Sequence, residues 1–152
     1  MTENAVVVWL RLPNGTFYPM KAGMTKLRER VATTLLETPN VNSPLRKREV
    51  LSHTAQLEFE GQRDRSDPVC EYLHGRYLKR GNDVLVTFIV YDEADKLTGN
   101  AYLAHQQQGY ICIEDPGSGT GILGSRIKGR IVYATAPQEG AFNVVLKRFT
   151  PY

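Results

Sequence analysis

The sequence has few of the residues that would mark a metal cluster, a disulfide framework or a membrane protein. It contains two cysteines and three histidines in 152 residues, and no long uninterrupted apolar run. Two cysteines exclude a disulfide-rich scaffold. The apolar stretch near the N-terminus ends at Arg11, which is too short for a signal-peptide core or a membrane span. We therefore expect synthesis in a cytoplasm and no membrane insertion by this chain.

An excess of charge of one sign is also missing. The 19 Lys and Arg residues stand against 16 Asp and Glu residues, and both signs are spread along the chain. A nucleic-acid arm or a membrane-surface helix would need a block of basic residues. The length and the hydrophobic fraction of 41% describe a single domain, residues 1–152, large enough to bury a core without metals or disulfides.

The cysteines and histidines form no recognisable reactive arrangement. Cys70 and Cys112 stand far apart among apolar neighbours, which indicates two buried thiols, with a disulfide between them as the minor alternative. His53, His74 and His105 lack the spacing of a metal site and the partners of a catalytic triad. We expect no catalytic residue, no metal and no cofactor, and infer that the protein is not an enzyme.

Hydrophobic alternation predicts a mainly β protein. Pro13-Asn14-Gly15 is a hairpin turn signal between two short strands. The stretch Thr25–Glu37 fits both a helical stripe and a strand face, and its threonines favour a strand. The run Val84–Tyr91 is apolar on both faces, which is typical of a central strand covered on both sides. The remaining strands are expected at residues 54–60, 100–107, 110–114, 125–134 and 141–149.

One helix is expected in the middle of the chain. Asp67 precedes Pro68, which is the pattern of an N-cap followed by proline at the first helical position. Apolar residues then recur every three to four positions until Gly81, which predicts a helix over about residues 67–80. The pattern as a whole predicts an antiparallel β-sandwich or barrel with one flanking α-helix.

Two polar loops interrupt the strand pattern. Residues 37–48 contain two prolines, two asparagines and a basic triplet, and predict a long exposed loop. Residues 115–121 are rich in glycine. A phosphate-binding loop would continue into a helix with Lys-Ser or Lys-Thr, whereas a strand pattern follows here, so we expect a simple connection.

The strand at residues 54–60 has one apolar and one polar face. Its polar face carries Gln56, Glu58 and Glu60. A later strand, residues 125–134, carries a basic row of Arg126, Lys128 and Arg130. That row could follow a nucleic acid, but the aromatic residues that would stack on bases do not alternate with it. Surface charge or a subunit contact is the better interpretation of the row.

The order of elements in the central block resembles the major tail tube proteins of long-tailed bacteriophages. The block runs from the strand Leu57–Glu60 through the turn Gly61–Pro68 and one helix to Gly81. A covered strand and late antiparallel strands reaching Gly129 then follow. The resemblance covers roughly residues 50–135 and depends on order and spacing rather than on a diagnostic motif.

The resemblance implies a structural virion protein. In that family, a β-sandwich with one flanking helix assembles into hexameric rings, and the rings stack into a tube through which viral DNA enters the host. It implies self-association, contacts with tape measure, terminator and baseplate proteins, transient passage of DNA, and a location in the virion tail. The N-terminal arm and the segment 141–152 would be assembly elements. The long loop would contact a neighbouring subunit or ring through Pro39, Asn40, Asn42, Pro44, Arg46, Lys47 and Arg48.

A channel for DNA should not hold phosphates, because basic residues would bind them. The expected lumen-facing residues are therefore Gln56, Glu58 and Glu60, with the basic row pointing elsewhere. We also expected that the strand at residues 54–60 pairs edge to edge with neighbouring subunits. A tail terminator or baseplate ring protein, and a monomeric β-barrel that binds a nucleic acid or ligand, remain the alternatives.

Overall fold

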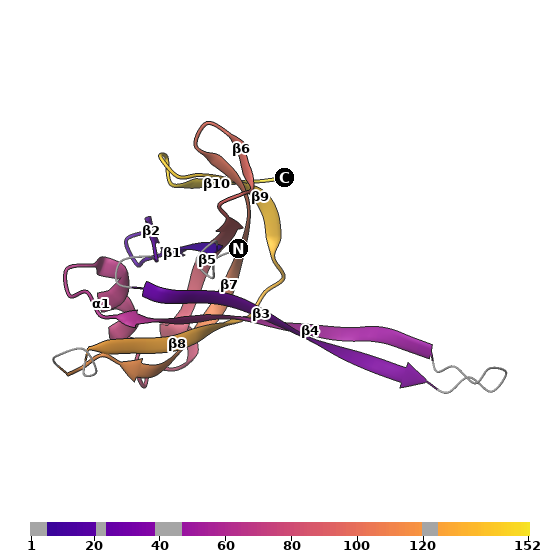
Figure 1. Ribbon diagram of the computed structural model, residues 1–152, viewed down its shortest axis with the longest axis horizontal. Helices are drawn as coiled ribbons and strands as arrows, with labels where there is room; N and C mark the ends of the chain where they lie inside the picture. Colours follow the sequence, from indigo (N-terminus) through magenta and orange to yellow (C-terminus); the bar gives the residue numbers. More distant parts are fainter. Residues whose placement is uncertain (1–5, 21–23, 39–46, 120–124) are drawn as a thin grey trace.

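The computed structural model describes residues 6–20, 24–38, 47–119 and 125–152 (Figure 1). In chain order, the elements are β1 (Val6–Arg11), β2 (Phe17–Pro19), β3 (Met24–Thr38), β4 (Lys47–Gln62), α1 (Pro68–His74), the 3-10 helix η1 (Gly81–Val84), β5 (Leu85–Asp92), β6 (Lys96–Thr98), β7 (Ala101–Pro116), β8 (Arg126–Tyr133), β9 (Gln138–Asn143) and β10 (Arg148–Pro151). The predicted mainly β fold with one α-helix is confirmed for these residues.

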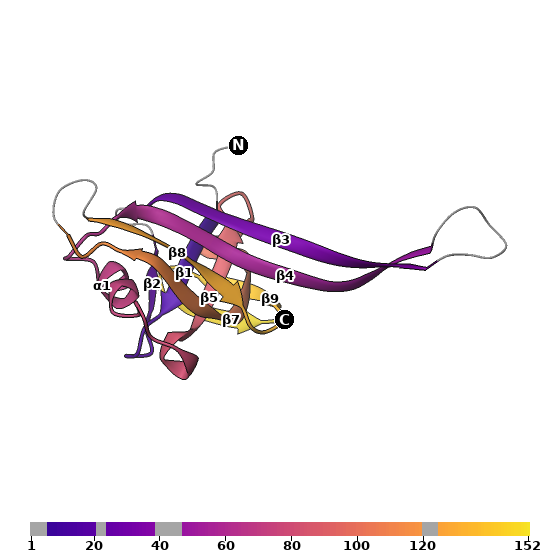
Figure 2. The ribbon, with the colours of Figure 1, turned by 90° about the horizontal axis from the view of Figure 1, so that it is seen from below.

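The strands form one antiparallel sheet. Its main order is β2-β1-β5-β7-β8-β4-β3, with β6 and β9 also paired to β7 and β10 paired to β9. The sheet curls, so that β1, near one end of the order, approaches β3 at the other end. Figure 2 shows the curled sheet from below, with α1 packed against β7 and β2. The curl encloses a core and leaves the other face of β3, β4 and β8 open.

Two apolar clusters lie on opposite faces of β1 and β5. The larger cluster lies inside the curl, and it includes Phe88 of β5 and Val69 and Leu73 of α1. The smaller cluster contains Trp9, Ile89, Tyr91 and Phe142, among other residues. Neighbouring residues of β5 thus enter different clusters, because side chains alternate along a strand. The predicted central strand, apolar on both faces, is confirmed.

The hairpin of β3 and β4 extends far beyond the rest of the protein (Figures 1 and 2). The two strands pair from Met24 and Gly61 out to Thr38 and Lys47. The neighbouring strand β8 pairs with β4 only as far as Gln56. We call the part beyond, residues 31–38 with residues 47–55, the arm; eight residues of strand span about 26 Å. The strand predicted at Thr25–Glu37 is therefore confirmed, and the stretch predicted as loop is partly strand.

The helix is shorter than predicted. Its start is as expected, because the Asp67 side chain accepts a hydrogen bond from the Cys70 N–H at 3.1 Å. It ends at His74 rather than at residue 80, with Gly75 as its C-cap. Glycine disfavours helix, and Leu78 lies in the left-handed region with φ 64°, so the chain turns away before Gly81.

Three further expectations need correction. The strands predicted at residues 100–107 and 110–114 are the single strand β7, which also takes in two residues of the predicted glycine-rich loop. Gly109 lies within β7 and does not interrupt it. A side chain at this position would collide with its neighbours, because a Cβ would lie 2.6 Å from Ile131 Cγ2 and 2.9 Å from Phe88 Cε1. The last predicted strand is a hairpin. Its turn is capped by Asn143 Oδ1, which accepts hydrogen bonds from the Val145 and Leu146 N–H groups. Cys70 is buried as predicted, but Cys112 is exposed, and no disulfide joins the two.

Candidate functional site

The arm holds the predicted contact loop at its far end. Pro39, Asn40, Asn42, Pro44 and Arg46 lie outside the described residues. Lys47 and Arg48 are not loop residues but the first two residues of β4, opposite Thr38 and Glu37 of β3. The predicted loop at residues 37–48 is therefore shorter at both ends, and its role in contacts stays a prediction.

The acidic and basic rows lie on the same face of the sheet. In the β4–β8 pairing, Glu58 is opposite Arg130 and Glu60 is opposite Lys128, and residues directly opposite each other project to the same side. The expectation that the basic row points away from Gln56, Glu58 and Glu60 is therefore wrong. The sequence could not reveal the register of these two strands. A shift of one residue would have placed the two rows on opposite faces of the sheet.

We call this surface of β3, β4 and β8, with the adjoining end of β7, the polar face. Its charged side chains are Lys26, Arg28, Arg30, Glu58, Glu60, Glu114, Arg126, Lys128 and Arg130. Basic residues outnumber acidic residues among them. An acidic surface was expected for a lumen. The polar face instead carries charges of both signs, with an excess of basic residues.

Ion pairs cross the strands of the polar face. Arg126 Nη2 lies 2.6 Å from Glu60 Oε1, and Lys128 Nζ lies 3.8 Å from Glu114 Oε2. Arg30 Nε lies 3.4 Å from Glu58 Oε1. These side chains are between about a quarter and a half exposed, so water screens each pair and each contributes little to stability. Their main effect is to place a carboxylate beside each of the three paired cations, Arg30, Arg126 and Lys128.

The free edge of this part of the sheet belongs to β3, not to β4. The strand predicted at residues 54–60 lies within β4, which pairs with β3 on one side and β8 on the other. The expectation that it meets a neighbouring subunit edge to edge is therefore wrong. Among the described residues, β3 ends the strand order, and its outer N–H and C=O groups can take up a further strand.

A polar cluster lies at the base of the arm, inside the curl. The Tyr133 hydroxyl donates a hydrogen bond to Glu29, and His105 Nε2 lies 4.0 Å from the same carboxylate. The other ring nitrogen of His105 is 2.7 Å from Gln107 Oε1. Burial first, and then the Glu29 carboxylate, raise the pKa of Tyr133 well above its ordinary value. The cluster was not predicted from the sequence, although a glutamate between Leu27 and Val31 on an otherwise apolar strand face was a signal for it.

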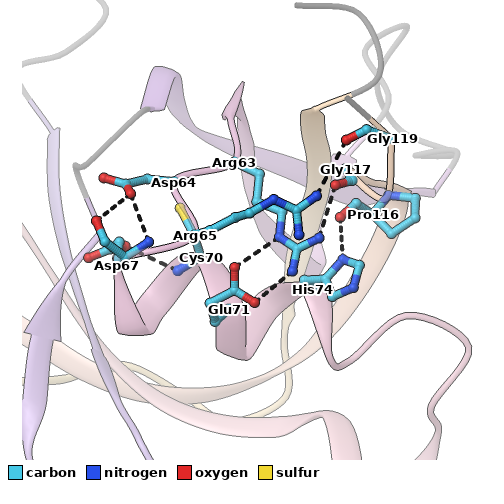
Figure 3. Close-up of polar contacts among 11 residues, drawn as sticks. Arg63, Asp64, Arg65, Asp67, Cys70, Glu71, His74, Pro116, Gly117 and Gly119 are labelled. Atoms are coloured by element: carbon cyan, nitrogen blue, oxygen red, sulfur yellow. Dashed lines mark hydrogen bonds and ion pairs between the residues drawn. The ribbon is translucent and has the colours of Figure 1, made fainter. Parts of the chain in front are cut away.

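A second polar network braces the other end of the polar face (Figure 3). Arg63, just after β4, donates to both carboxylate oxygens of Glu71 on α1, at 3.0 and 2.6 Å, and to the Gly117 carbonyl at 3.1 Å. His74 Nδ1 lies 2.6 Å from the Pro116 carbonyl. The hydrogen bonds from Arg63 hold the pKa of Glu71 below its usual range. The network joins β4, α1 and the end of β7, and we assign it a structural role.

Part of the predicted glycine-rich loop belongs to this brace. Gly117 has φ 67°, and a Cβ there would lie 3.1 Å from both Arg63 Cβ and the Ser125 carbonyl. Its carbonyl and that of Gly119 accept hydrogen bonds from Arg63 and Arg65. The positive φ, together with these tight contacts, favours glycine at position 117. Residues 120–124 lie outside the described part.

The histidines of the described residues lie apart from one another. Among them, no group of three or more His, Cys, Asp and Glu side chains could hold a metal ion. His74 and His105 lie in separate networks, and His53 lies in β4. Nor does any helix in the described ranges have the length and apolar character needed to cross a membrane.

Comparison with solved structures shows the same fold in tail particles. No protein-family model and no curated protein matches this sequence. A chain from the tail of an empty gene transfer agent particle, determined with C6 symmetry, superimposes with a TM-score of 0.62 and 15% identity, covering 90% of this chain and 96% of that one. A chain from the virion of a native gene transfer agent particle gives 0.61 and 15%, covering 91% and 98%. The resemblance to tail proteins inferred from the sequence is thus confirmed at the level of the fold.

Proposed function

We propose that this protein is a structural subunit of a phage-like tail, which assembles into stacked hexameric rings that form the tail tube. DNA passes through the tube into the host cell, and the protein resides in the virion. The observation that carries the proposal is the structural match over nearly the whole length of both chains to a component of a tail with C6 symmetry.

The sheet offers a means of closing a ring. The free edge of β3 in one subunit would accept a strand from the next subunit, because an unpaired edge exposes a row of hydrogen-bonding groups. Each contact of this kind joins two different surfaces, and such contacts close into rings. The four adjacent strands β7, β8, β4 and β3 would then form each subunit's share of the tube wall.

We propose that the polar face lines the channel, with Gln56, Glu58 and Glu60 among the lumen residues. The basic residues on the same face would attract phosphates. The carboxylates of Glu58, Glu60 and Glu114 lie beside several of these cations and would compete with DNA for them. Passing DNA would therefore meet a wet surface of paired charges rather than a continuous basic track.

The arm reaches far enough to contact a neighbouring subunit or ring. We propose this role for its end, which carries Pro39, Asn40, Asn42, Pro44, Arg46, Lys47 and Arg48. The segment 141–152 and the N-terminal residues would add further contacts, and tape measure, terminator and baseplate proteins would complete the tail. Assembly requires no enzymatic activity and no cofactor.

Electron microscopy and sedimentation over a concentration series test the proposal. We expect hollow tubes or stacked rings as the concentration of purified protein rises. Single rings that never stack would instead indicate a terminator or baseplate ring protein. A monomer at every concentration, including after addition of preformed tail-tube seeds, would contradict the proposal and direct attention to ligand binding.

A loop replacement tests the role of the arm's end. Thr38 and Lys47 are paired, so residues 39–46 can be replaced by Asn-Gly, which closes a hairpin with a two-residue turn. We expect an unchanged melting temperature of the monomer but no stacking of rings. Tubes formed at the normal concentration would show that the end of the arm is not needed.

A further inference from the structure

Two surface features of this chain, one projecting and one recessed, expose apolar side chains. One is the turn between β9 and β10, residues 144–147, which we call the tip. The other is a pocket of about 690 Å³ at the base of the arm. Neither belongs to the polar face or to the free edge of β3. The function proposed above gives the pocket no role, and it counts the tip only as part of the segment 141–152, with no partner surface named.

The tip is a rigid apolar projection. Val145 and Leu146 are 64% and 67% exposed, and both of their N–H groups donate to Asn143 Oδ1, at 3.0 and 2.9 Å. The Lys147 ammonium lies over the ring of Tyr18 in the same chain, 5.4 Å from its centroid. The cation is therefore turned back on its own subunit, and the tip presents two aliphatic side chains already held in place.

The pocket has apolar walls and a satisfied polar floor. Its lining residues are Glu29, Val31, Ala55, His105, Tyr133, Ala134, Thr135, Ala136 and Pro137. Val31 is 61% exposed although it is aliphatic. The Glu29 carboxylate on the floor already accepts from Tyr133 and would repel an anion, so the pocket does not suit phosphate or DNA. Small side chains along the connection from β8 to β9 leave room for aliphatic groups.

We propose that the tip of one subunit inserts into the pocket of another copy of this chain. The inference rests on the proposed function, since it adds a second contact to the same ring or tube. The tip and the pocket lie on different sides of the protein: in Figure 1 the β9–β10 turn points to the upper left, and the connection from β8 to β9 runs along the right. A projection and a recess on different sides of one chain join copies head to tail, which is the arrangement that closes rings.

Burial explains why the second copy is the fitting occupant. Insertion would remove Val31, Val145 and Leu146 from water at once, and apolar area removed from water is the main favourable term in association. Because the tip is already ordered by Asn143, its insertion costs little conformational entropy. A few well-packed side chains carry most of an interface's energy, so truncation of a side chain that enters the pocket should weaken association measurably.

Cross-linking between variants that each carry one exposed cysteine, with Cys70 left in place because it is buried, tests the contact. The exposed Cys112 is first replaced by serine, and Ala136→Cys and Leu146→Cys are introduced in separate chains. The two proteins are mixed under assembly conditions and treated with a short bis-maleimide. We expect a cross-linked heterodimer that neither variant forms alone. Leu146→Ala in the otherwise unchanged protein should weaken association by about 30-fold.

Leu78 provides the matched control. It is also a leucine at a surface turn and is 83% exposed, but it lies between α1 and η1 rather than at the tip. Leu78→Cys mixed with Ala136→Cys should give no cross-link above background. Ala136→Trp in the otherwise unchanged protein fills the pocket and should weaken association as Leu146→Ala does, while the circular dichroism spectrum of the monomer stays the same.

Each outcome decides the inference. Tubes that form normally without the Ala136–Leu146 cross-link would overturn it and leave the proposed function intact. A protein that forms neither oligomers nor cross-links would overturn both. Equal cross-linking by Leu78→Cys would show non-specific association. A small molecule that is seen by native mass spectrometry and lost in Ala136→Trp would make the pocket a ligand site instead.

Discussion

The carboxylates of the polar face should control how tightly the protein holds DNA. Glu60 lies 2.6 Å from Arg126 Nη2, and Glu58 lies 3.4 Å from Arg30 Nε. The double variant Glu58→Gln/Glu60→Gln keeps the shape of both side chains but removes two charges. Two cations then lose their partners and become available to phosphates. Because these pairs are partly exposed and individually weak, the variant should fold normally.

The salt dependence of binding gives the magnitude. Each additional phosphate contact makes the slope of log K against log[salt] steeper by about 0.9. Two contacts therefore add about 1.8 to the slope. Between about 50 and 200 mM salt, the variant should lose about tenfold more affinity for duplex DNA than the unchanged protein loses. Its affinity at the lower salt concentration should be correspondingly higher.

Fluorescence anisotropy with a labelled duplex, at four or five salt concentrations, measures both quantities. The matched control is Glu93→Gln/Glu139→Gln, which changes the net charge equally at exposed positions outside the polar face. If the two double variants bind with the same slope, the carboxylates do not mask the cations of the polar face. The account of the channel surface given above would then be refuted.

Three other predictions concern the helix, the brace and the thiols. Asp67→Ala should lower the free energy of unfolding by about 1 kcal/mol in urea denaturation, because the N-cap bond to the Cys70 N–H is lost; an unchanged midpoint would contradict this role. The pKa of Glu71 is lowered by Arg63, so its contribution to stability is present above its ordinary pKa of 4.5 and lost as the pH falls through the lowered value. Glu71→Gln should accordingly flatten the loss of melting temperature in acid, and an equally steep loss would argue against the brace. A thiol reagent at pH 8 should label Cys112 and spare Cys70 in the native monomer, since Cys70 is buried and burial raises its pKa to about 11; labelling of both would show that α1 opens readily.

Periodic patterns in the sequence were sufficient to predict most strands. The alternation of Leu57 and Phe59 with glutamates, and the apolar run in β5, each matched a buried face that the structure contains. Asp67-Pro68 predicted the start of α1 because capping is a local interaction. The end of α1 was missed, since Gly75 and the left-handed Leu78 are weaker signals in the sequence than Gly81.

Register and long-range proximity could not be predicted. Nothing in the local pattern of Glu58 or Arg130 indicates that they lie opposite each other, so the acidic and basic rows were wrongly separated. The strand β7 was predicted as two strands with a gap at residues 108 and 109, since nothing in the local sequence shows that Gly109 lies against Ile131 within one strand. The cluster of Glu29, Tyr133 and His105 joins three strands, and only the folded sheet brings it together.

The arm has a consequence for the kinetics of growth. Beyond Gln56 the paired strands have no third strand beside them among the described residues, and a two-stranded ribbon alone is marginally stable in water. Two free subunits that meet must therefore order both arms for a single new contact, whereas a subunit joining an existing end docks its arm on a surface already formed. Starting a polymer should thus be slow and extending it fast, with a lag phase that preformed ends abolish. Polymer length would then be set by how many ends are available rather than by the affinity of one subunit for another.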